Sequence, residues 1–252
     1  MKVTILGCGS SGGVPRIGGD WGDCDPTNPK NRRRRCSILV ETDRTSVLVD
    51  TSPDMREQLL DANVTDLDGV IWTHDHADQS HGLDDLRVLA ITHRRRIEVW
   101  GNAETLARLK KKFGYCFPQE ATKAYPAILS DHLIDGPFRV GDIDIVPFEQ
   151  DHGTMMSLGF RFGPVSYAND VVHLDDRAFE VMAGSEVLIV DALRYRPHPT
   201  HAHLERALEW IDRVKPARAV LTNMHVDLDY DRLSRELPEG VVPAYDGMVI
   251  DA

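Results

Sequence analysis

The residues best suited to chemistry in this sequence are histidines and aspartates that follow expected strands. His74, His76 and Asp78 come directly after a short apolar segment, 68–72, that is typical of a strand. In an extended chain, residues two positions apart point to the same side, so both imidazoles can face one point. Neutral imidazole is a good ligand for zinc and other first-row ions, and a carboxylate two residues further on can reach a neighbouring ion. The spacing therefore indicates a divalent metal site, although polar turn residues can show the same pattern.

Three more residues repeat this arrangement further along the chain. His152, Asp170 and His225 each lie just beyond an expected strand. One such residue alone is more often a solvated loop residue or a satisfied polar group. Several strand ends that all present His or Asp favour a shared metal site over a set of unrelated surface residues.

The elements that must position these residues are strands, many paired as hairpins, and helices interleaved with them. Strands are expected at 3–6, 37–41, 46–49, 68–72, 97–100, 138–148, 158–162, 165–168, 187–190 and 219–222, and helices at 53–60, 82–92, 103–113, 203–214 and 229–236. We find no internal repeat or linker, so residues 1–252 are interpreted as a single domain. Periodicity leaves two architectures open, a doubly wound sheet and two sheets covered by helices.

The order of the histidines and aspartates resembles the metallo-β-lactamase superfamily of hydrolases, whose motif H-x-H-x-D-H is followed by a lone His, a bridging Asp and a final His. The Gly/Ser loop at 7–13, Asp50 after the third strand and the segment 81–87 are similar to the branch that contains the PhnP-like phosphodiesterase. This resemblance implies an α/β (α+β) fold, the four-layer αββα metallo-β-lactamase sandwich. The metal site would then lie at one edge of the sandwich, between its two sheets.

The resemblance also implies a role for each candidate residue. His74, His76 and His152 would hold the first ion, Asp170 would bridge, and Asp78 and His225 would bind the second. The cofactor would be a divalent metal, Zn or Mn, with one or two ions per chain and a metal-activated hydroxide as nucleophile; Asp78 would thus also be a catalytic residue. Some relatives hold a structural zinc with clustered cysteines in the early loop, but only Cys24 lies within 14–35, so we expect no such site here.

One position departs from the motif. The residue after Asp78 should be His, and this chain has Gln79. An amide oxygen is a weak, neutral ligand that matches zinc poorly, although manganese or magnesium accepts it. His81 is only two residues further on, but it would point elsewhere if Gln79 opens a helix. We therefore expect the second site to be weaker than the first, and filled partially or by a harder ion.

The leaving group of a hydrolysis also needs a proton. Phosphodiesterases and tRNA-processing relatives in this superfamily place a His near the start of a helix, and His201 matches that position best because the helix 203–214 follows it. We expect His201 to be the general acid. His198 and His203 are alternatives, and a solvent-facing turn rich in His is the simpler explanation. Asp50 is expected to orient a ligating imidazole.

Composition limits the partners of the protein. The chain has 252 residues, and 29 Lys and Arg against 40 Asp and Glu give a net charge of −11. This charge disfavours duplex DNA and anionic membranes as partners of the whole surface. The run Arg32–Arg35 is typical of a solvated face, and the alternative is a rim that attracts phosphate. Four scattered cysteines are expected to be reduced and mostly buried, and the expected location is the cytoplasm.

These observations favour a metal-dependent hydrolase that acts on a small phosphodiester. The alternatives are a tRNA 3′-processing-like endonuclease, a thioester or lactone hydrolase, and a weakly active protein that keeps a single metal because Gln79 replaces a motif His. A tRNA-processing enzyme usually carries an extended basic arm, and no insertion here is typical of one. We expect a small-molecule substrate as partner, with neither nucleic acid nor a membrane, and a homodimer stays open.

Overall fold

Two mixed sheets face each other in the computed structural model, which describes residues 1–118 and 126–252. The first sheet has the order β14 (Val249–Asp251), β1 (Lys2–Gly7), β2 (Ser37–Glu41), β3 (Ser46–Val49), β4 (Gly69–Ile71), β5 (Ile97–Gly101) and β6 (Leu129–Leu133). The second has the order β13 (Val241–Pro243), β12 (Arg218–Thr222), β11 (Val187–Asp191), β10 (Val165–Ala168), β9 (Met156–Phe162), β8 (Ile143–Asp151) and β7 (Phe138–Val140). The doubly wound alternative is therefore excluded.

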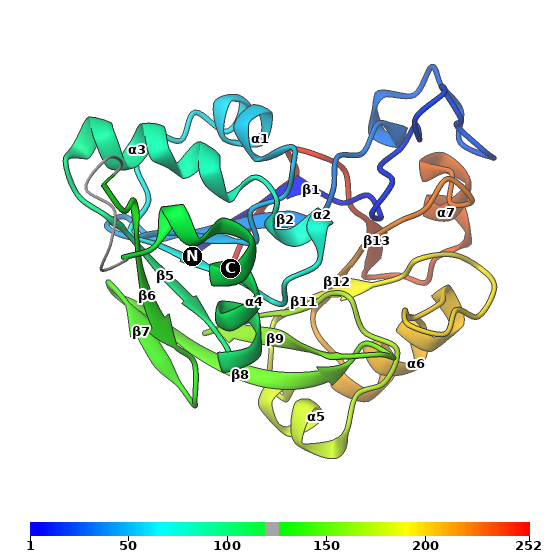
Figure 1. Cartoon of the computed structure of the whole chain (residues 1–252). Coiled ribbons are helices and arrows are strands. Elements are labelled where there is room, and N and C mark those ends of the chain that lie inside the picture. Colours follow the sequence, from blue (N-terminus) through cyan, green and yellow to red (C-terminus); the bar gives the residue numbers. More distant parts are fainter. Residues whose placement is uncertain (119–125) are drawn as a thin grey trace.

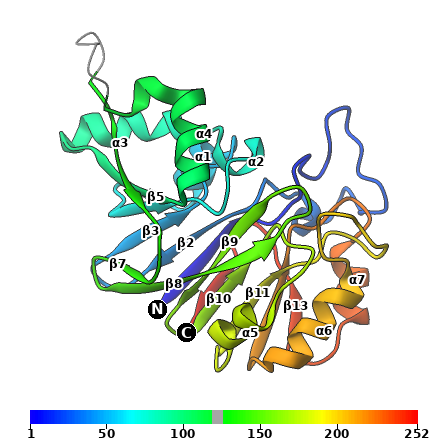
Figure 2. The same ribbon diagram turned by 60° about the horizontal axis from the view of Figure 1, so that its bottom comes forward.

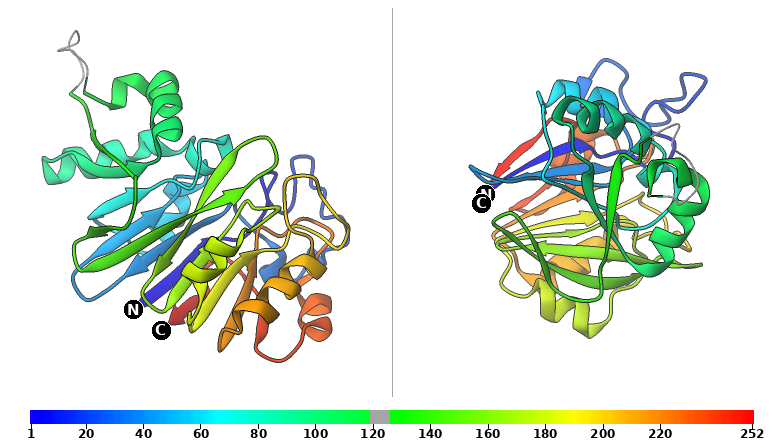
Figure 3. Two further views of the ribbon diagram at one scale, coloured as in Figure 1. Left: turned by 90° about the horizontal axis from the view of Figure 1, so that it is seen from below. Right: turned by 60° about the vertical axis from the view of Figure 1, so that its left-hand side comes forward.

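Helices cover the outer faces of both sheets, so the molecule has four layers (Figures 1 and 3). They are α1 (Met55–Asp61), α2 (Ala77–Ser80), α3 (Leu86–His93), α4 (Ala103–Phe113), α5 (Asp176–Met182), α6 (Leu204–Val214) and α7 (Tyr230–Glu236). The αββα architecture expected from the sequence is confirmed. Within the described ranges, no helix is long and apolar enough to cross a membrane.

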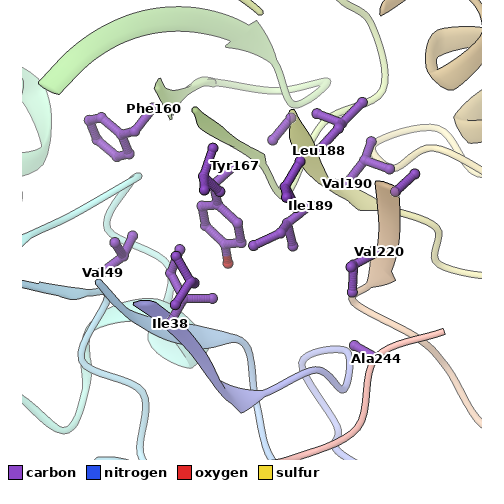
Figure 4. Packing of buried hydrophobic residues seen from close by; sticks show 14 of the residues in the cluster. Ile38, Val49, Phe160, Tyr167, Leu188, Ile189, Val190, Val220 and Ala244 are labelled. Atoms are coloured by element: carbon purple, nitrogen blue, oxygen red, sulfur yellow. The ribbon is translucent and has the colours of Figure 1, made fainter. Parts of the chain in front are cut away.

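The central strands are apolar on both faces because each sheet is covered on both sides. In β2, Ile38 and Val40 belong to the core that includes the space between the sheets, whereas Leu39 packs in the core beneath the helices of the first sheet. Figure 4 shows Ile38 opposite Tyr167, which comes from β10 of the second sheet. These strands consequently lack the polar alternation of half-exposed strands.

Most predicted elements are confirmed, including the hairpin that turns at residues 141–142. The sequence analysis missed β6, β13, β14, α2 and α5, which are short, and placed the start of α3 too early. A single 3₁₀ turn, Leu83–Asp85, precedes that helix. Brief segments contain too few residues to show a clear period, and their structure depends on pairing with a neighbouring strand or sheet.

The carboxyl ends of several parallel strands meet at one edge of the sandwich. β3 is parallel to β4, and β10, β11 and β12 are parallel to one another. Asp50, Asp170 and Asn223 follow β3, β10 and β12 within two residues, and their φ angles of 64°, 55° and 60° are left-handed. Asp and Asn tolerate this conformation better than most other residues. The chain therefore turns sharply at each strand end while the polar side chain stays buried.

The arginine run lies in a long loop between β1 and β2 that packs beside α7 (Figures 1 and 2). Arg33 is only 2% exposed and donates hydrogen bonds to the backbone carbonyls of His225 and Leu228. Arg34 and Arg35 form ion pairs with Asp246, Asp61 and Asp54. The solvated-face interpretation is therefore wrong for these three arginines, which fasten the loop to the body of the protein, and buried Arg33 cannot form part of a rim that attracts phosphate. The four cysteines are free and buried, as predicted.

Candidate metal centre

Three imidazoles meet between the two sheets, at the edge where the carboxyl ends of the parallel strands lie. His74 and His76 lie between β4 and α2, and His152 follows β8. The ring centroids lie 4.5 Å (His74–His76), 5.0 Å (His74–His152) and 5.1 Å (His76–His152) apart. One ring nitrogen from each residue lies within 4.8 Å of the other two. The structure therefore brings together the three residues that the resemblance assigns to the first ion.

A hydrogen-bond chain fixes the tautomer of His74. Thr73 Oγ1 donates to Asp50 Oδ2 at 2.9 Å and lies 2.9 Å from His74 Nδ1. Because the hydroxyl proton goes to the carboxylate, the oxygen must accept a proton from Nδ1. Nε2 then carries a lone pair, and this atom is buried without a hydrogen-bond partner in residues 1–118 and 126–252. A buried lone pair that receives no proton fits a bound cation.

His152 presents a lone pair in the same way, and its Nε2 faces the ring of His76. His152 Nδ1 donates to the carbonyl of Thr200 at 2.8 Å, which leaves a lone pair on Nε2. This Nε2 faces Nδ1 of His76 at 3.3 Å. Burial is the main cause that lowers the pKa of His152 to about 4, and it also holds the pKa of His74 well below its usual range. Both rings are thus neutral at pH 7, the form that binds a metal.

Three buried carboxylates surround these rings. Asp50 and Asp191 have no exposed surface and Asp170 is 2% exposed. In the part of the chain that the structure describes, none of them forms an ion pair with Lys or Arg. Burial raises the pKa of Asp50 and of Asp170 well above the usual range, and the charges of Asp78 and Asp191 raise that of Asp170 further. Buried carboxylates stay ionised only beside a cation, so this donor set fits a divalent ion.

Gln79 contacts the residue that is expected to bridge the two ions. Its Nε2 donates to Asp170 Oδ2 at 2.8 Å, and the same oxygen accepts from Asn169 Nδ2 at 2.6 Å. Gln79 Oε1 is buried and has no hydrogen-bond partner among the described residues. The amide therefore competes with a cation for Oδ2. His81 packs its ring against Phe113, with 5.4 Å between the ring centroids, and belongs to neither of the groups of described residues that could share an ion.

The remaining two expected ligands lie outside the clusters. Among the described residues, the groups close enough to share one ion are His74, His76 and His152, and His152, Asp170 and His201. Asp78 is half-buried in the first turn of α2, and burial raises its pKa. His225 Nδ1 donates to Asp227 Oδ1 at 3.0 Å, and its Nε2 lies 3.3 Å from Nη1 of Arg16. The structure thus assembles the first site more completely than the second.

His201 lies beside this centre, in the loop before α6. Its Nδ1 is 3.0 Å from Asp191 Oδ2 and 3.6 Å from Asp170 Oδ1, and its ring centroid is 4.8 Å from that of His152. Burial opposes a positive charge on this ring, but the two carboxylates outweigh it and raise the pKa of His201 to about 9. These carboxylates therefore favour the protonated form of the His201 ring beside the candidate ligands.

The two alternative histidines have other contacts. His198 Nδ1 accepts from the backbone N–H of Thr200 at 3.3 Å, and burial is the main cause that lowers its pKa. His203 is the N-cap residue of α6 and lies 3.8 Å from Glu205. In the described ranges, neither forms an ion pair with a buried carboxylate of the centre.

The sequence analysis missed several residues of this centre. Asp191 ends β11, and Asn223 donates from Nδ2 to Asp170 Oδ1 at 3.3 Å. Both stand at strand ends, the same signal that identified His152 and Asp170. Thr73 was missed because a hydroxyl beside a histidine has no sequence pattern of its own. Asp50, expected to orient an imidazole directly, does so through Thr73.

A family model described as "Beta-lactamase superfamily domain" matches residues 45–224, which is more than half of the chain. The chain belongs to the metallo-β-lactamase superfamily. A crystal structure described as a new diphosphatase from the PhnP family is 34% identical, with a TM-score of 0.92, and the match covers 100% of this chain and 97% of that one. The present chain is therefore a PhnP-like member of the superfamily.

Less similar structures share the fold. Zn²⁺-bound PqqB from Methylobacterium extorquens is 18% identical, with a TM-score of 0.76 and coverage of 100% for both chains. The short form of human tRNase Z is also 18% identical, with a TM-score of 0.71 and coverage of 100% of this chain and 99% of that one. At this identity the likeness shows the fold alone.

A curated relative carries a different name. The "Octanoyltransferase" of Porphyromonas gingivalis is 32% identical over 253 residues, which cover 98% of this chain and 51% of that protein. The chain thus spans about half the length of this relative.

The family, the PhnP-like match and the buried imidazole–carboxylate cluster together identify this chain as a metal-dependent hydrolase.

We expect Thr73→Val to weaken zinc binding about 10- to 100-fold, because it removes the hydroxyl that fixes the His74 tautomer. Zinc affinity is measured by competition with a chromophoric chelator. Ser166→Ala is the matched control, since this buried hydroxyl bonds to Ser185 instead. Equal zinc affinity in Thr73→Val and Ser166→Ala would contradict the orienting role of Thr73.

Proposed function

We propose that this PhnP-like protein hydrolyses a small phosphodiester or, as the description of its relative as a diphosphatase suggests, the P–O–P anhydride linkage between two phosphates. The observation that carries the proposal is the full-length match, at 34% identity, to a protein described as a diphosphatase. The phosphorus oxygens of such a substrate are anionic. A centre that combines a cation with a protonated His201 suits this charge.

We propose His74, His76 and His152 as the ligands of the first ion. Three nitrogen ligands favour zinc, while the carboxylates nearby would also suit manganese. A divalent ion bound here supplies Lewis acidity and lowers the pKa of a bound water. The chain fixes the tautomers of His74 and His152, and the Asp50–Thr73 pair keeps the His74 lone pair directed away from the hydroxyl.

His201 is the residue we assign as general acid. Its ring lies close to Asp170 and His152, and Asp191 accepts from Nδ1, which orients the ring and favours its charged form. A leaving alkoxide or phosphate oxygen beside Asp170 would receive this proton. His201→Ala removes the donor and leaves the three imidazoles of the first site in place.

The second position, formed by Asp78, Asp170 and His225, is proposed to bind an ion weakly. The support is the 2.8 Å hydrogen bond by which the Gln79 amide engages Asp170 Oδ2. An ion that binds Asp170 Oδ2 must displace the Gln79 amide group, or the amide must turn so that its own oxygen faces the ion. Either change costs a buried hydrogen bond.

Thioester hydrolysis is a second candidate. It is favoured by the name of the octanoyltransferase relative, half of whose length this chain matches. The same activated water can attack an acyl carbon. An acyl thioester, however, brings no phosphoryl charge to the centre. Substrate charge therefore separates the two candidates experimentally.

Zinc- and manganese-loaded protein should hydrolyse bis-p-nitrophenyl phosphate and a dinucleoside diphosphate at least tenfold faster than an octanoyl thioester or a tRNA precursor. Rates are measured on a common panel, with the metal content of each sample determined by elemental analysis.

His201→Ala should retain its metal and lose about 10²- to 10⁴-fold in turnover, because the leaving group lacks a proton donor. His203→Ala serves as the control. Faster hydrolysis of the thioester than of the phosphorus substrates would contradict the proposal, and so would full turnover by His201→Ala.

Gln79→His should raise the number of tightly bound zinc ions from about one to about two per chain, because it supplies the imidazole that zinc prefers and frees Asp170 Oδ2. Isothermal titration calorimetry gives the stoichiometry. Gln150→His is the control, as Gln150 is equally buried but bonds to Ser157 and Asn169. Two tight sites in the unmodified protein would show that Gln79 does not weaken the second position.

A further inference from the structure

The loop between β1 and β2 carries an arginine to the edge of the candidate centre. Arg16 Nη1 lies 3.3 Å from Nε2 of His225, the atom that would face a second ion. His225 donates its other ring proton to Asp227, so this Nε2 accepts from Arg16. The guanidinium thus bonds to the nitrogen of His225 that a second ion would use.

The orientation of Arg16 is built into the loop. Its Nε and Nη2 both donate to Asp20 Oδ2, with an Nε distance of 2.9 Å, and Asp20 Oδ1 accepts from the backbone N–H of Gly22 at 3.0 Å. The backbone of Arg16 also donates to the Asp20 carbonyl at 2.9 Å. The stem of Arg16 crosses Gly12, where an added Cβ would lie only 3.2 Å from Arg16 Cγ. The guanidinium is therefore held at a defined place.

The loop itself is docked onto the segment that contains His225. Asp23 donates from its backbone to the Val226 carbonyl at 2.9 Å, and a Cβ on Gly22 would lie 2.7 Å from the Val226 side chain. Buried Arg33 donates to the carbonyls of His225 and Leu228. The backbone that carries Arg16 is consequently fastened to the segment that carries His225.

Arg16 keeps unused hydrogen-bonding capacity. A guanidinium has five N–H donors, and the described contacts use three of them. The side chain is 44% exposed, so the remaining donors can reach a ligand. A planar fork of this kind suits two oxygens of a phosphate.

We propose that Arg16 is a substrate-binding residue whose free N–H donors hold a phosphoryl group beside His225, where a second metal ion would otherwise lie. This assignment rests on the proposed function, and it predicts specificity for substrates with an anionic group next to the reacting bond. A neutral substrate gains nothing from Arg16.

Binding of inorganic pyrophosphate to the zinc-loaded protein, measured by calorimetry, tests this assignment without requiring turnover. Arg16→Ala should raise the dissociation constant about 10- to 100-fold, the range expected for charged hydrogen bonds. Arg16→Lys should recover only part of the loss, because an ammonium keeps the charge without the fork. Arg44→Ala is the matched control, since Arg44 also makes two bonds to one carboxylate oxygen, of Asp142, in the β2–β3 turn.

Zinc content is recorded for every variant and should stay unchanged, because Arg16 does not contact the three imidazoles of the first site. A pyrophosphate dissociation constant within twofold of the unmodified protein would overturn the assignment. Loss of zinc in Arg16→Ala would also overturn it, since Arg16 would then act on the metal site. If no phosphodiester is hydrolysed but pyrophosphate binding still depends on Arg16, the proposed function fails while the anion site stands.

Discussion

The feature on which the rest of this structure depends is a buried group of unprotonated nitrogens and carboxylates that requires a cation. His74 Nε2 is buried without a proton donor in the described chain, and the Nε2 of His152 faces Nδ1 of His76 at 3.3 Å. Asp50, Asp170 and Asp191 are buried beside them without Lys or Arg partners in the same ranges. Such an arrangement is unfavourable in an apolar interior unless positive charge is supplied. We propose that a divalent ion at the imidazoles, together with the charged form of His201, supplies it.

The fold meets this requirement by bringing strand ends from both sheets to one edge. Each sheet contains parallel strands whose carboxyl ends meet there, and left-handed backbone at Asp50, Asp170 and Asn223 turns polar side chains inward. The β1–β2 loop closes the same edge from outside and brings Arg16 to His225. Rigid strands therefore fix the ligands, whereas the loop contributes the residue that we propose contacts substrate.

Much of this arrangement can be predicted from the sequence because chemistry and secondary structure coincide at strand ends. The apolar composition of the strands predicts where they lie, and His or Asp directly after them indicates the site. The separation of two sheets from one could not be predicted from periodicity, since strands covered on both faces look alike in both architectures. The two-sheet architecture was predicted from the resemblance of the His and Asp motif to the metallo-β-lactamase superfamily.

Other features depend on contacts between distant residues and have no local signal. The burial of Arg33 follows from its bonds to the carbonyls of His225 and Leu228, almost 200 residues away in the chain. Thr73 matters because Asp50 lies beside it, and the Gln79 amide matters because it reaches Asp170. His225 lies outside the two clusters because its ring faces Arg16 and Asp227, which the motif does not reveal.

X-ray absorption spectroscopy at the zinc edge, on protein loaded with one equivalent of zinc, tests the central claim most directly. We expect a first shell of nitrogen and oxygen at about 2.0–2.1 Å with the multiple scattering of three imidazoles. Replacing His74, His76 or His152 by Ala, one at a time, should remove one imidazole from that shell. A shell of oxygen or sulfur without imidazole, unchanged by these substitutions, would contradict the placement of the ion at the three histidines.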